Sequence, residues 1–368
     1  MLAFSLLNLL RFIMNAVTTY EDRIFLATQV ADEARHHVFF DRYLREVCGV
    51  GKNTANTLDL VRPSLTWGYK QVFDELDRVS DQLRLAPHNK SLLAQGVALY
   101  HLVVEGMLAH TGQHYLRDYV ERNHIFPSYR KGIGLLTRDE SRHIAFGIRL
   151  LREMVSNDPA CKQAVIRLLN RVLPWAAGVF VPPDIDWTYI TSMGYTVQEV
   201  FAFAIRSIET KLSRAGIRPD EILALVKLGP ADPPAMQADR IVAFIEGGIL
   251  GTDKAPQVNE KTMDAIFSAM CNVAAWTQPR FPNVHATIQW IFDDAQPRYL
   301  EISTERGPYV TSGHATRPDL TLRCTAQDWG YIARGEISTQ RAALTRRLRI
   351  SGNLSLALKL PRILPVTD

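Results

Sequence analysis

The feature that most constrains the fold is an eight-residue pattern that occurs twice in the chain. The pattern Asp-Glu-x-Arg-His-x-x-Phe runs from Asp32 to Phe39 and again from Asp139 to Phe146. Both copies lie in long segments whose apolar residues recur at helical spacing. Positions i and i+3 of an α-helix share a face, so each copy presents a carboxylate beside an imidazole. The sequence therefore predicts two helices with matched Glu–His pairs.

Two such pairs that face each other across a helix bundle can hold two metal ions. The candidate ligands are Glu33 and His36 in the first copy, and Glu140 and His143 in the second. Carboxylates bridge two hard cations, while one imidazole completes the coordination of each ion. The alternative is two clusters of surface salt bridges. The repetition of the whole pattern, each time inside a long helix, favours the metal site.

The other polar residues of the pattern suit a supporting role. A ligating imidazole usually donates its second N–H to an acceptor, most often a carboxylate. Asp32 and Asp139 can supply that acceptor, most simply with each aspartate orienting the histidine of the opposite motif. Arg35 and Arg142 can balance the negative charge behind the site. Alternatively, these aspartates and arginines are exposed ion pairs beside the ligands.

A fifth candidate ligand lies on a third predicted helix. Glu105 is the one glutamate in the otherwise apolar stretch 99–115. Because the burial of an unpaired carboxylate is costly, we expect Glu105 to bind metal, in a position that bridges the two ions. His101, His110 and His114 lie around this helix and do not repeat, so we expect ordinary core or surface histidines.

The order E-x-x-H, isolated Glu, E-x-x-H resembles the ferritin-like carboxylate-bridged dimetal proteins. Within them it is most similar to the ligand-binding oxidases of the ribonucleotide reductase small-subunit superfamily. That family has a similar interval between the isolated glutamate and the second motif, here 140 − 105 = 35 residues, and a tyrosine that matches Tyr100. Phe40 replaces the radical-storing tyrosine of the reductase small subunits. The resemblance covers about residues 1–215 and implies an α-helical, ferritin-like bundle.

The resemblance also implies an activity. It implies two metal ions, Mn/Fe or Fe/Fe, that activate dioxygen beside a long-chain acyl ligand, and it implies a homodimer. The electron donor is unknown. On this basis Tyr100 is the candidate catalytic residue, with a redox-active or gating role.

The chain departs from the family pattern at its N-terminus. The family has six protein ligands, and its first glutamate would fall immediately before Met1. We expect either a truncated N-terminus or a misplaced start, because the chain begins inside an uncapped helical pattern; the remaining possibility is an incomplete site. Leu2 stands where the family has a β-branched residue that cross-links to the tyrosine, which disfavours a cross-link to Tyr100.

The rest of the chain changes character after the helical part. Residues 216–257 are rich in Pro and Gly, and we interpret them as a connector. Residues 258–368 have the pattern of an α+β domain, with a helix at 261–276 and a final helix from Asn353. Alternating runs predict a meander of antiparallel strands at 285–292, 299–304, 308–314 and 319–325.

This second domain resembles the sterol carrier protein type 2 domain. The resemblance depends on the order of strands and paired short helices, and on the closing sequence RRLRISGNLSLALKL. It implies lipid binding in an apolar tunnel, and the apolar C-terminal helix with Leu354, Leu356, Leu358 and Leu360 is consistent with one. The alternative is a small packing or dimerisation module.

Composition excludes several other classes. With 47% hydrophobic and 22% charged residues, the chain is typical of soluble globular proteins. A net charge of +4 with mixed signs gives no basic stripe for nucleic acid. The apolar N-terminus is too short and too interrupted for a signal peptide or a membrane span, so no integral membrane protein is expected. Four scattered cysteines are typical of a cytoplasmic protein.

Together these features predict a dimetal carboxylate oxidase fused to a lipid-carrier domain. Such an enzyme would use dioxygen to oxidise a hydrophobic acyl, sterol or quinone-type substrate. One alternative is an amine N-oxygenase of the same architecture, which Leu136 disfavours because those enzymes carry an extra histidine there. The other is a non-catalytic lipid-binding protein with a vestigial metal site.

Overall fold

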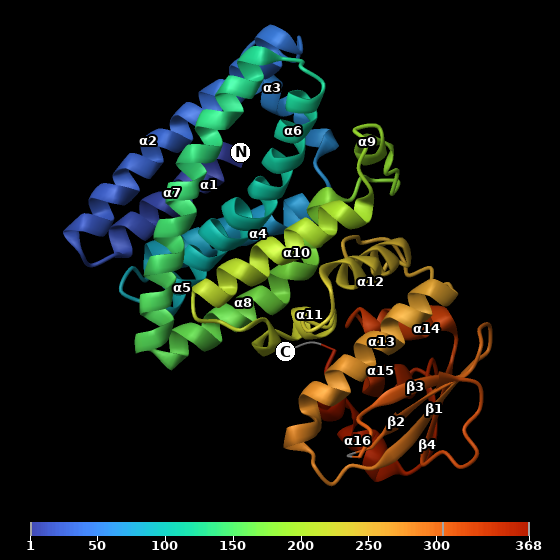
Figure 1. Cartoon of the computed structure of the whole chain (residues 1–368). Helices are drawn as coiled ribbons and strands as arrows, with labels where there is room; N and C mark the ends of the chain where they lie inside the picture. Colours follow the sequence, from blue (N-terminus) through green and yellow to red (C-terminus); the bar gives the residue numbers. More distant parts are fainter. Residues whose placement is uncertain (1, 304, 367–368) are drawn as a thin grey trace. The chain divides into compact units, whose positions relative to one another are not determined.

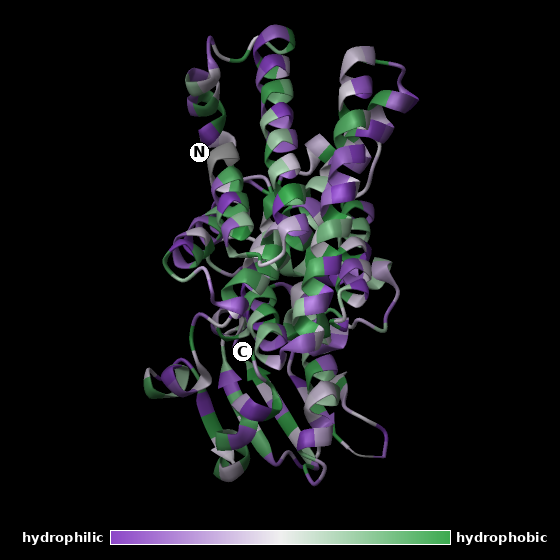
Figure 2. Cartoon of the chain, turned by 90° about the vertical axis from the view of Figure 1, so that its left-hand side faces the viewer, coloured by the Kyte–Doolittle hydropathy of each residue, from purple (hydrophilic) through white to green (hydrophobic). Residues whose placement is uncertain are grey.

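The computed structural model describes residues 2–303 and 305–366 of the chain. The chain divides into two compact units between Arg218 and Pro219 (Figure 1). Each unit buries its own apolar core. In Figure 2 the helices carry hydrophobic and hydrophilic residues side by side along their length, as expected of helices with one buried and one exposed face.

The first unit is helical in its described residues, which confirms the predicted all-α architecture. Its elements are α1 (Leu2–Ala16), α2 (Tyr20–Arg42), η1 (Tyr43–Val47), α3 (Thr54–Val61), η2 (Arg62–Ser64), α4 (Trp67–Leu85), α5 (Lys90–Val97), η3 (Ala98–Ala109), α6 (His110–Arg122), α7 (Pro127–Asn157), α8 (Pro159–Ala177), η4 (Gly178–Phe180), α9 (Thr188–Thr191) and α10 (Val197–Arg214).

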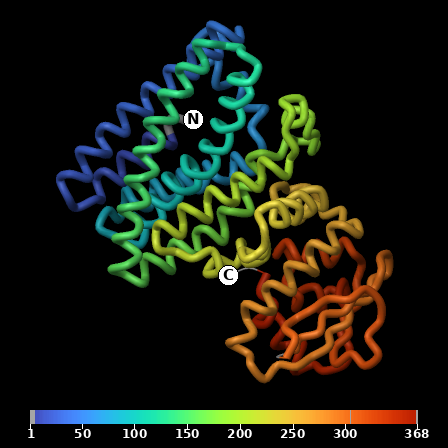
Figure 3. Tube along the Cα trace, viewed as in Figure 1, coloured from blue at the N-terminus to red at the C-terminus, as the bar shows by residue number. Residues whose placement is uncertain are grey.

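Local sequence explains where the two motif helices begin. The hydroxyl of Thr19 accepts a hydrogen bond from the amide of Asp22 and caps α2, whose first turn is acidic. α7 begins at Pro127, which lacks an N–H and so removes one of the donors that would be unpaired in the first turn. Figure 3 shows the trace of α2 beside that of α7, although about a hundred residues separate the two motifs. The bundle therefore brings the repeated motifs together.

The helix that carries Glu105 combines α-helical and π-helical segments. α5, η3 and α6 form one continuous helix, and η3 is π-helical, with hydrogen bonds between residues five apart. In a regular α-helix, Tyr100 and Glu105 would lie roughly 140° apart around the axis. The wider π turn brings both side chains to the same interior, where burial leaves them 0% and 3% exposed.

The same continuous helix has the length and composition of a membrane span. Among the described residues it is Lys90–Arg122 that meets this criterion, with a mean hydropathy of 1.5 in its most apolar window. However, 83% of that window is buried inside the unit. Core helices of water-soluble proteins meet the same criterion, so the helix is weak evidence for a membrane span.

The second unit contains a mixed sheet covered by helices, which confirms the predicted α+β class. Its elements are η5 (Pro219–Glu221), α11 (Leu223–Val226), α12 (Pro234–Glu246), α13 (Glu260–Thr277), η6 (Gln278–Arg280), β1 (Ala286–Phe292), β2 (Arg298–Ile302), β3 (Tyr309–Ser312), β4 (Leu320–Cys324), α14 (Ala326–Ala333), α15 (Thr339–Leu344), β5 (Arg349–Gly352) and α16 (Leu354–Ile363).

The sheet is not the expected antiparallel meander. Its described strands run in the order β3-β2-β1-β4-β5, and β1 pairs antiparallel with β2 but parallel with β4. The buried amide of Gln289 holds the connection after β3, because it donates to Gly313 O and accepts from the backbone N–H of Ala315. Alternation along a strand defines its buried face but not its partner, which is why the pattern did not reveal the parallel pair.

Two further segments differ from the sequence expectations. Residues 219–257, interpreted as a connector, lie in the second unit, where Ile222, Leu225 and Val226 are buried beside short helices. In α16, Leu356 and Leu360 are buried whereas Leu354 and Leu358 are exposed. This helix is therefore amphipathic and contributes one face to the core.

A close approach between α7 and η3 gives a test of the bundle. A Cβ atom on Gly147 would lie 2.2 Å from the Cβ of His101, whereas one on Gly134 of the same helix would meet nothing within 4 Å. We expect Gly147→Ala to lower the free energy of unfolding by about 1–3 kcal/mol through overpacking. Gly134→Ala is the matched control and should raise it by about 0.5–1 kcal/mol through helix propensity.

Urea unfolding followed by helical circular dichroism measures both variants. Equal stabilities of Gly147→Ala and Gly134→Ala would contradict the close packing of α7 on η3.

Candidate metal centre

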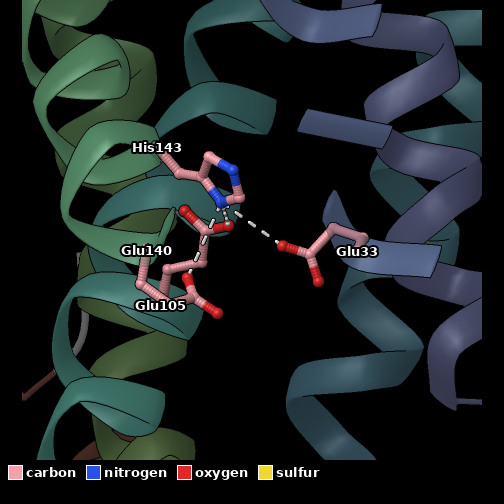
Figure 4. Close-up of side chains that lie close together, drawn as sticks. All are labelled: Glu33, Glu105, Glu140 and His143. Atoms are coloured by element: carbon pink, nitrogen blue, oxygen red, sulfur yellow. Dashed lines mark ion pairs between the residues drawn. The ribbon is translucent and has the colours of Figure 1, made fainter. Parts of the chain in front are cut away.

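Four side chains from three separate segments meet in the interior of the first unit. They are Glu33 on α2, Glu105 on η3, and Glu140 and His143 on α7; one ligand atom of each lies within 4.8 Å of the others (Figure 4). Glu105, Glu140 and His143 are buried and Glu33 is nearly so. The sequence-predicted ligands on all three helices therefore come together.

The two imidazoles define two halves of this cluster. His143 Nδ1 lies 3.3 Å from Glu105 Oε1, 3.4 Å from Glu33 Oε1 and 3.8 Å from Glu140 Oε2. His36 Nδ1 lies 3.7 Å from Glu33 Oε2 and 3.6 Å from Glu140 Oε1. Glu33 and Glu140 thus each place one oxygen beside each imidazole.

The position of Glu105 differs from the expected bridge. Among the described residues, the imidazole that Glu105 contacts is that of His143. The carboxylates that span both halves are those of Glu33 and Glu140. Glu105 is restrained on its side because Gln29 Nε2 donates a 3.0 Å hydrogen bond to its Oε1.

Each histidine is held from behind by the aspartate of the other motif. His143 Nε2 lies 3.1 Å from Asp32 Oδ2, and His36 Nε2 lies 3.4 Å from Asp139 Oδ2. Because Nε2 is engaged in both rings, Nδ1 is the nitrogen that faces the cluster. This crossed arrangement is the one that metal-ligating histidines require.

Two arginines complete the crossed network at the edge of the site. Arg35 pairs with Asp32 and lies 3.8 Å from Asp139. Arg142 donates to Asp139 at 2.5 Å and to Asp32 at 3.2 Å. The guanidinium side chains are 66% and 52% exposed, whereas the Asp32 side chain is 6% exposed. The arginines therefore neutralise buried aspartate charge from the solvent side.

Six buried polar atoms at the centre lack hydrogen-bond partners. The buried atoms in this state are Glu33 Oε1, Glu105 Oε2, Glu140 Oε2, His36 Nδ1, His143 Nδ1 and the hydroxyl of Tyr100. Each such atom costs about 1–3 kcal/mol when it stays unsatisfied. Carboxylate oxygens and imidazole nitrogens are ligands that suit iron and manganese, so the donor set fits a pair of such ions.

The electrostatics of the cluster indicate the need for a cation. Burial lowers the pKa of His143, but the contacts with Glu105, Glu140 and Glu33 outweigh it and raise this pKa to about 12. Burial opposes ionisation of Glu33, yet His143 and His36 hold its pKa at about 2. Burial and the nearby Glu140 raise the pKa of Glu105 well above its usual range. In the metal-free cluster, protons balance the negative charge, and metal ions can take the place of these protons.

Tyr100 lies at the same centre. Its side chain is fully buried, and burial, with Glu33, Glu105 and Glu140 close by, raises the pKa of its phenol well above the usual value. Tyr100 is therefore a neutral phenol that retains its proton. The two remaining family expectations, a ligand before Met1 and a cross-link partner at Leu2, concern positions outside the residues whose side chains the structure describes.

Apolar rings shield one side of the cluster from water. Phe25 stacks on Phe146 with ring centroids 4.2 Å apart, and it meets the His143 ring edge-on at 6.5 Å. A dry environment strengthens the charge interactions inside the site.

Sequence reasoning missed two groups that support Glu105. One is Gln29, whose spacing of four residues from Glu33 on α2 could have revealed it as a residue on the same face. The other lies behind η3: Lys211 donates to Ser207 Oγ at 2.6 Å, and Ser207 donates to Gly106 O at 2.7 Å. Burial lowers the pKa of Lys211 to about 8. No local pattern reveals that α10 packs there.

Comparison with known proteins identifies the second unit first. Residues 267–365 match the family model described as the SCP-2 sterol transfer family. This segment is an SCP2 domain. The sterol-carrier resemblance of the sequence is therefore confirmed, and the domain includes the whole sheet and α16.

Solved structures similar to the remainder are R2-like ligand-binding oxidases. One from Sulfolobus acidocaldarius is 22% identical, covers 58% of this chain and 70% of its own, and has a TM-score of 0.45. A variant described with an aerobically reconstituted Mn/Fe cofactor is also 22% identical, covers 58% of this chain and 78% of its own, and has a TM-score of 0.46. At this level of similarity, residue roles depend on the geometry of this chain alone.

The protonation of the cluster predicts a pH dependence. The pKa of His143 at about 12 keeps its ring charged near neutral pH in the metal-free chain, and the contacts with Glu33, Glu140 and Asp139 also raise the pKa of His36. A metal ion needs neutral imidazoles, so binding must displace these protons. We therefore expect Mn²⁺ affinity to increase with pH and protons to be released on binding.

Calorimetric titrations in two buffers with different protonation enthalpies measure the released protons. The Glu33→Ala/Glu140→Ala double variant serves as the control and should show little Mn²⁺ uptake. Identical heats in both buffers, together with a pH-independent affinity, would contradict the assignment.

Proposed function

We propose that the chain is a dimetal carboxylate oxidase, with two ions, Mn/Fe or Fe/Fe, held by Glu33, His36, Glu105, Glu140 and His143. The observation that carries this proposal is the convergence of five side chains, each with one buried N or O atom that has no hydrogen-bond partner, while the outward nitrogen of each imidazole is held by an aspartate. Bound iron or manganese would supply the redox chemistry for the reduction of dioxygen.

In this proposal the protein's own groups have distinct tasks. Glu33 and Glu140 would supply ligand oxygens to both halves of the site, since each places one oxygen by each imidazole. Asp32 and Asp139 would keep the rings oriented. Tyr100, a neutral phenol beside Glu33, would hold a proton at its hydroxyl close to the reacting centre.

The nature of the substrate belongs to the same proposal. The SCP2 domain supports a hydrophobic substrate of the acyl, sterol or quinone type, because the family to which it belongs is described as sterol transfer. An external donor would supply electrons, and a homodimer and a cytoplasmic location remain predictions. The amine N-oxygenase alternative is less well supported, since Leu136 lies in an apolar cluster with Val120, Tyr129 and Ile133 and adds no ligand.

Elemental analysis tests the metal assignment. We expect the chain loaded with iron and manganese to hold up to two metal ions and to consume dioxygen when a reductant is present. Glu140→Ala should lose most of its metal content and most of its dioxygen consumption, because Glu140 reaches both halves of the site. Glu153→Ala, on the same helix but with a 60% exposed side chain, is the matched control and should behave as the native chain.

Full metal content in Glu140→Ala would reject the metal assignment. Less than one ion in the native chain would instead favour the alternative of a vestigial site and a non-catalytic lipid-binding protein.

Photo-crosslinking tests the lipid partner separately. We expect a fatty acid that carries a diazirine group to label the full chain within residues 267–365, the segment that matches the SCP2 family. Peptide mass spectrometry would locate the labelled residues, and an excess of unmodified fatty acid is the competition control. Labelling confined to the first unit, or labelling without competition, would count against lipid binding by this domain.

A further inference from the structure

A buried polar chain leads from the core of the first unit to Glu105. Gln29 and His101 are both 0% exposed. His101 Nε2 lies 3.2 Å from Gln29 Oε1, and Gln29 Nε2 donates to Glu105 Oε1 at 3.0 Å. Neither residue is among the proposed metal ligands. A different role must therefore explain why two polar side chains are buried here.

The chemistry of the three groups fixes the direction of this chain. A carboxylate that binds a metal ion can only accept hydrogen bonds, so the amide of Gln29 must direct its NH₂ group toward Glu105. Its Oε1 then faces His101 and needs a donor, which is the Nε2–H group of the neutral imidazole. Burial lowers the pKa of His101 to about 3, which agrees with a neutral ring.

The packing leaves little freedom to His101. The backbone of Gly147 lies against the His101 side chain, where even a methyl group would not fit. With the proton on Nε2, Nδ1 donates no hydrogen bond to Val97 O, 3.3 Å away, so the close packing is what restrains the ring. The ring therefore acts as a fixed support for Gln29.

The result of these contacts is that Glu105 is held beside His143. Gln29 engages Glu105 Oε1, while Oε2 has no hydrogen-bond partner. Of the two imidazoles, the one that Glu105 contacts in the described structure is His143. Among the described residues, Glu33 and Glu140 reach both imidazoles, whereas Glu105 reaches that of His143.

We infer that Gln29 and His101 are positioning residues that hold Glu105 on the His143 half and so set the affinity of that metal position. This inference rests on the proposed function, because it assumes that the cluster binds metal. The removal of hydrogen-bond partners of metal ligands typically weakens metal binding about 10–100-fold.

The test is a Co²⁺ titration of the full chain, followed by visible absorption and calorimetry. The native chain should bind Co²⁺ in two steps, one for each half. Gln29→Leu should weaken one of the two steps about 10–100-fold, change its absorption band and leave the other step unchanged. His101→Leu should weaken the same step, and His101→Gln, which keeps a donor, should restore part of the affinity.

Gln113→Leu is the matched control. Gln113 is also a buried glutamine of the bundle, but its side chain accepts a hydrogen bond from Thr137 rather than donating one to Glu105. This variant should keep the two-step titration and the native absorption band, and its thermal unfolding measures the cost of losing a buried amide.

The outcomes separate the two levels of the proposal. Two unchanged steps and an unchanged spectrum in Gln29→Leu would overturn the positioning role while the metal site stands. Equal weakening of both steps would show a general structural effect and would also overturn it. No Co²⁺ uptake by the native chain would reject the proposed function and this inference together.

Discussion

The crossed pairing of Asp32 with His143 and of Asp139 with His36 is the interaction on which the rest of the first unit depends. It joins α2 to α7 at the level of the metal cluster and determines which ring nitrogen faces inward. With both Nε2 atoms engaged, the Nδ1 atoms share the interior with the carboxylates of Glu33, Glu105 and Glu140. Carboxylates at such distances in a buried place repel one another unless protons or cations lie among them. The two Asp–His pairs therefore place three carboxylates in one buried cluster, which needs protons or cations to balance its negative charge.

The second constraint is the π-helical winding of η3, which brings two side chains of one helix to the same centre. Tyr100 and Glu105 can both reach the centre only if residues five apart share a face, and a π turn provides that spacing. This less stable winding needs support from its neighbours. Ser207 donates to Gly106 O, Lys211 donates to Ser207, and Gly147 allows α7 to approach closely. The stability of the site thus depends on residues that touch no ligand.

These dependencies explain what the sequence could and could not predict. The Glu–His pairs and the crossed aspartates could be anticipated, because i and i+3 spacing is local and an imidazole ligand needs an acceptor. The contact of Glu105 with the His143 half could not be predicted, because it depends on a hydrogen bond from Gln29 on another helix. The parallel pairing of β1 with β4 escaped prediction for a similar reason: alternation identifies the buried face of a strand, while the partner is set by the path of the connection.

The two halves of the centre come from one repeated motif, so any difference between them comes from residues outside the motif. Taken alone, the repeats place the same two carboxylates, Glu33 and Glu140, beside each imidazole. Glu105 adds a further carboxylate beside His143, where its charge acts at short range. The buried pair of Gln29 and His101 maintains this contact, because Gln29 holds the Glu105 carboxylate from another helix.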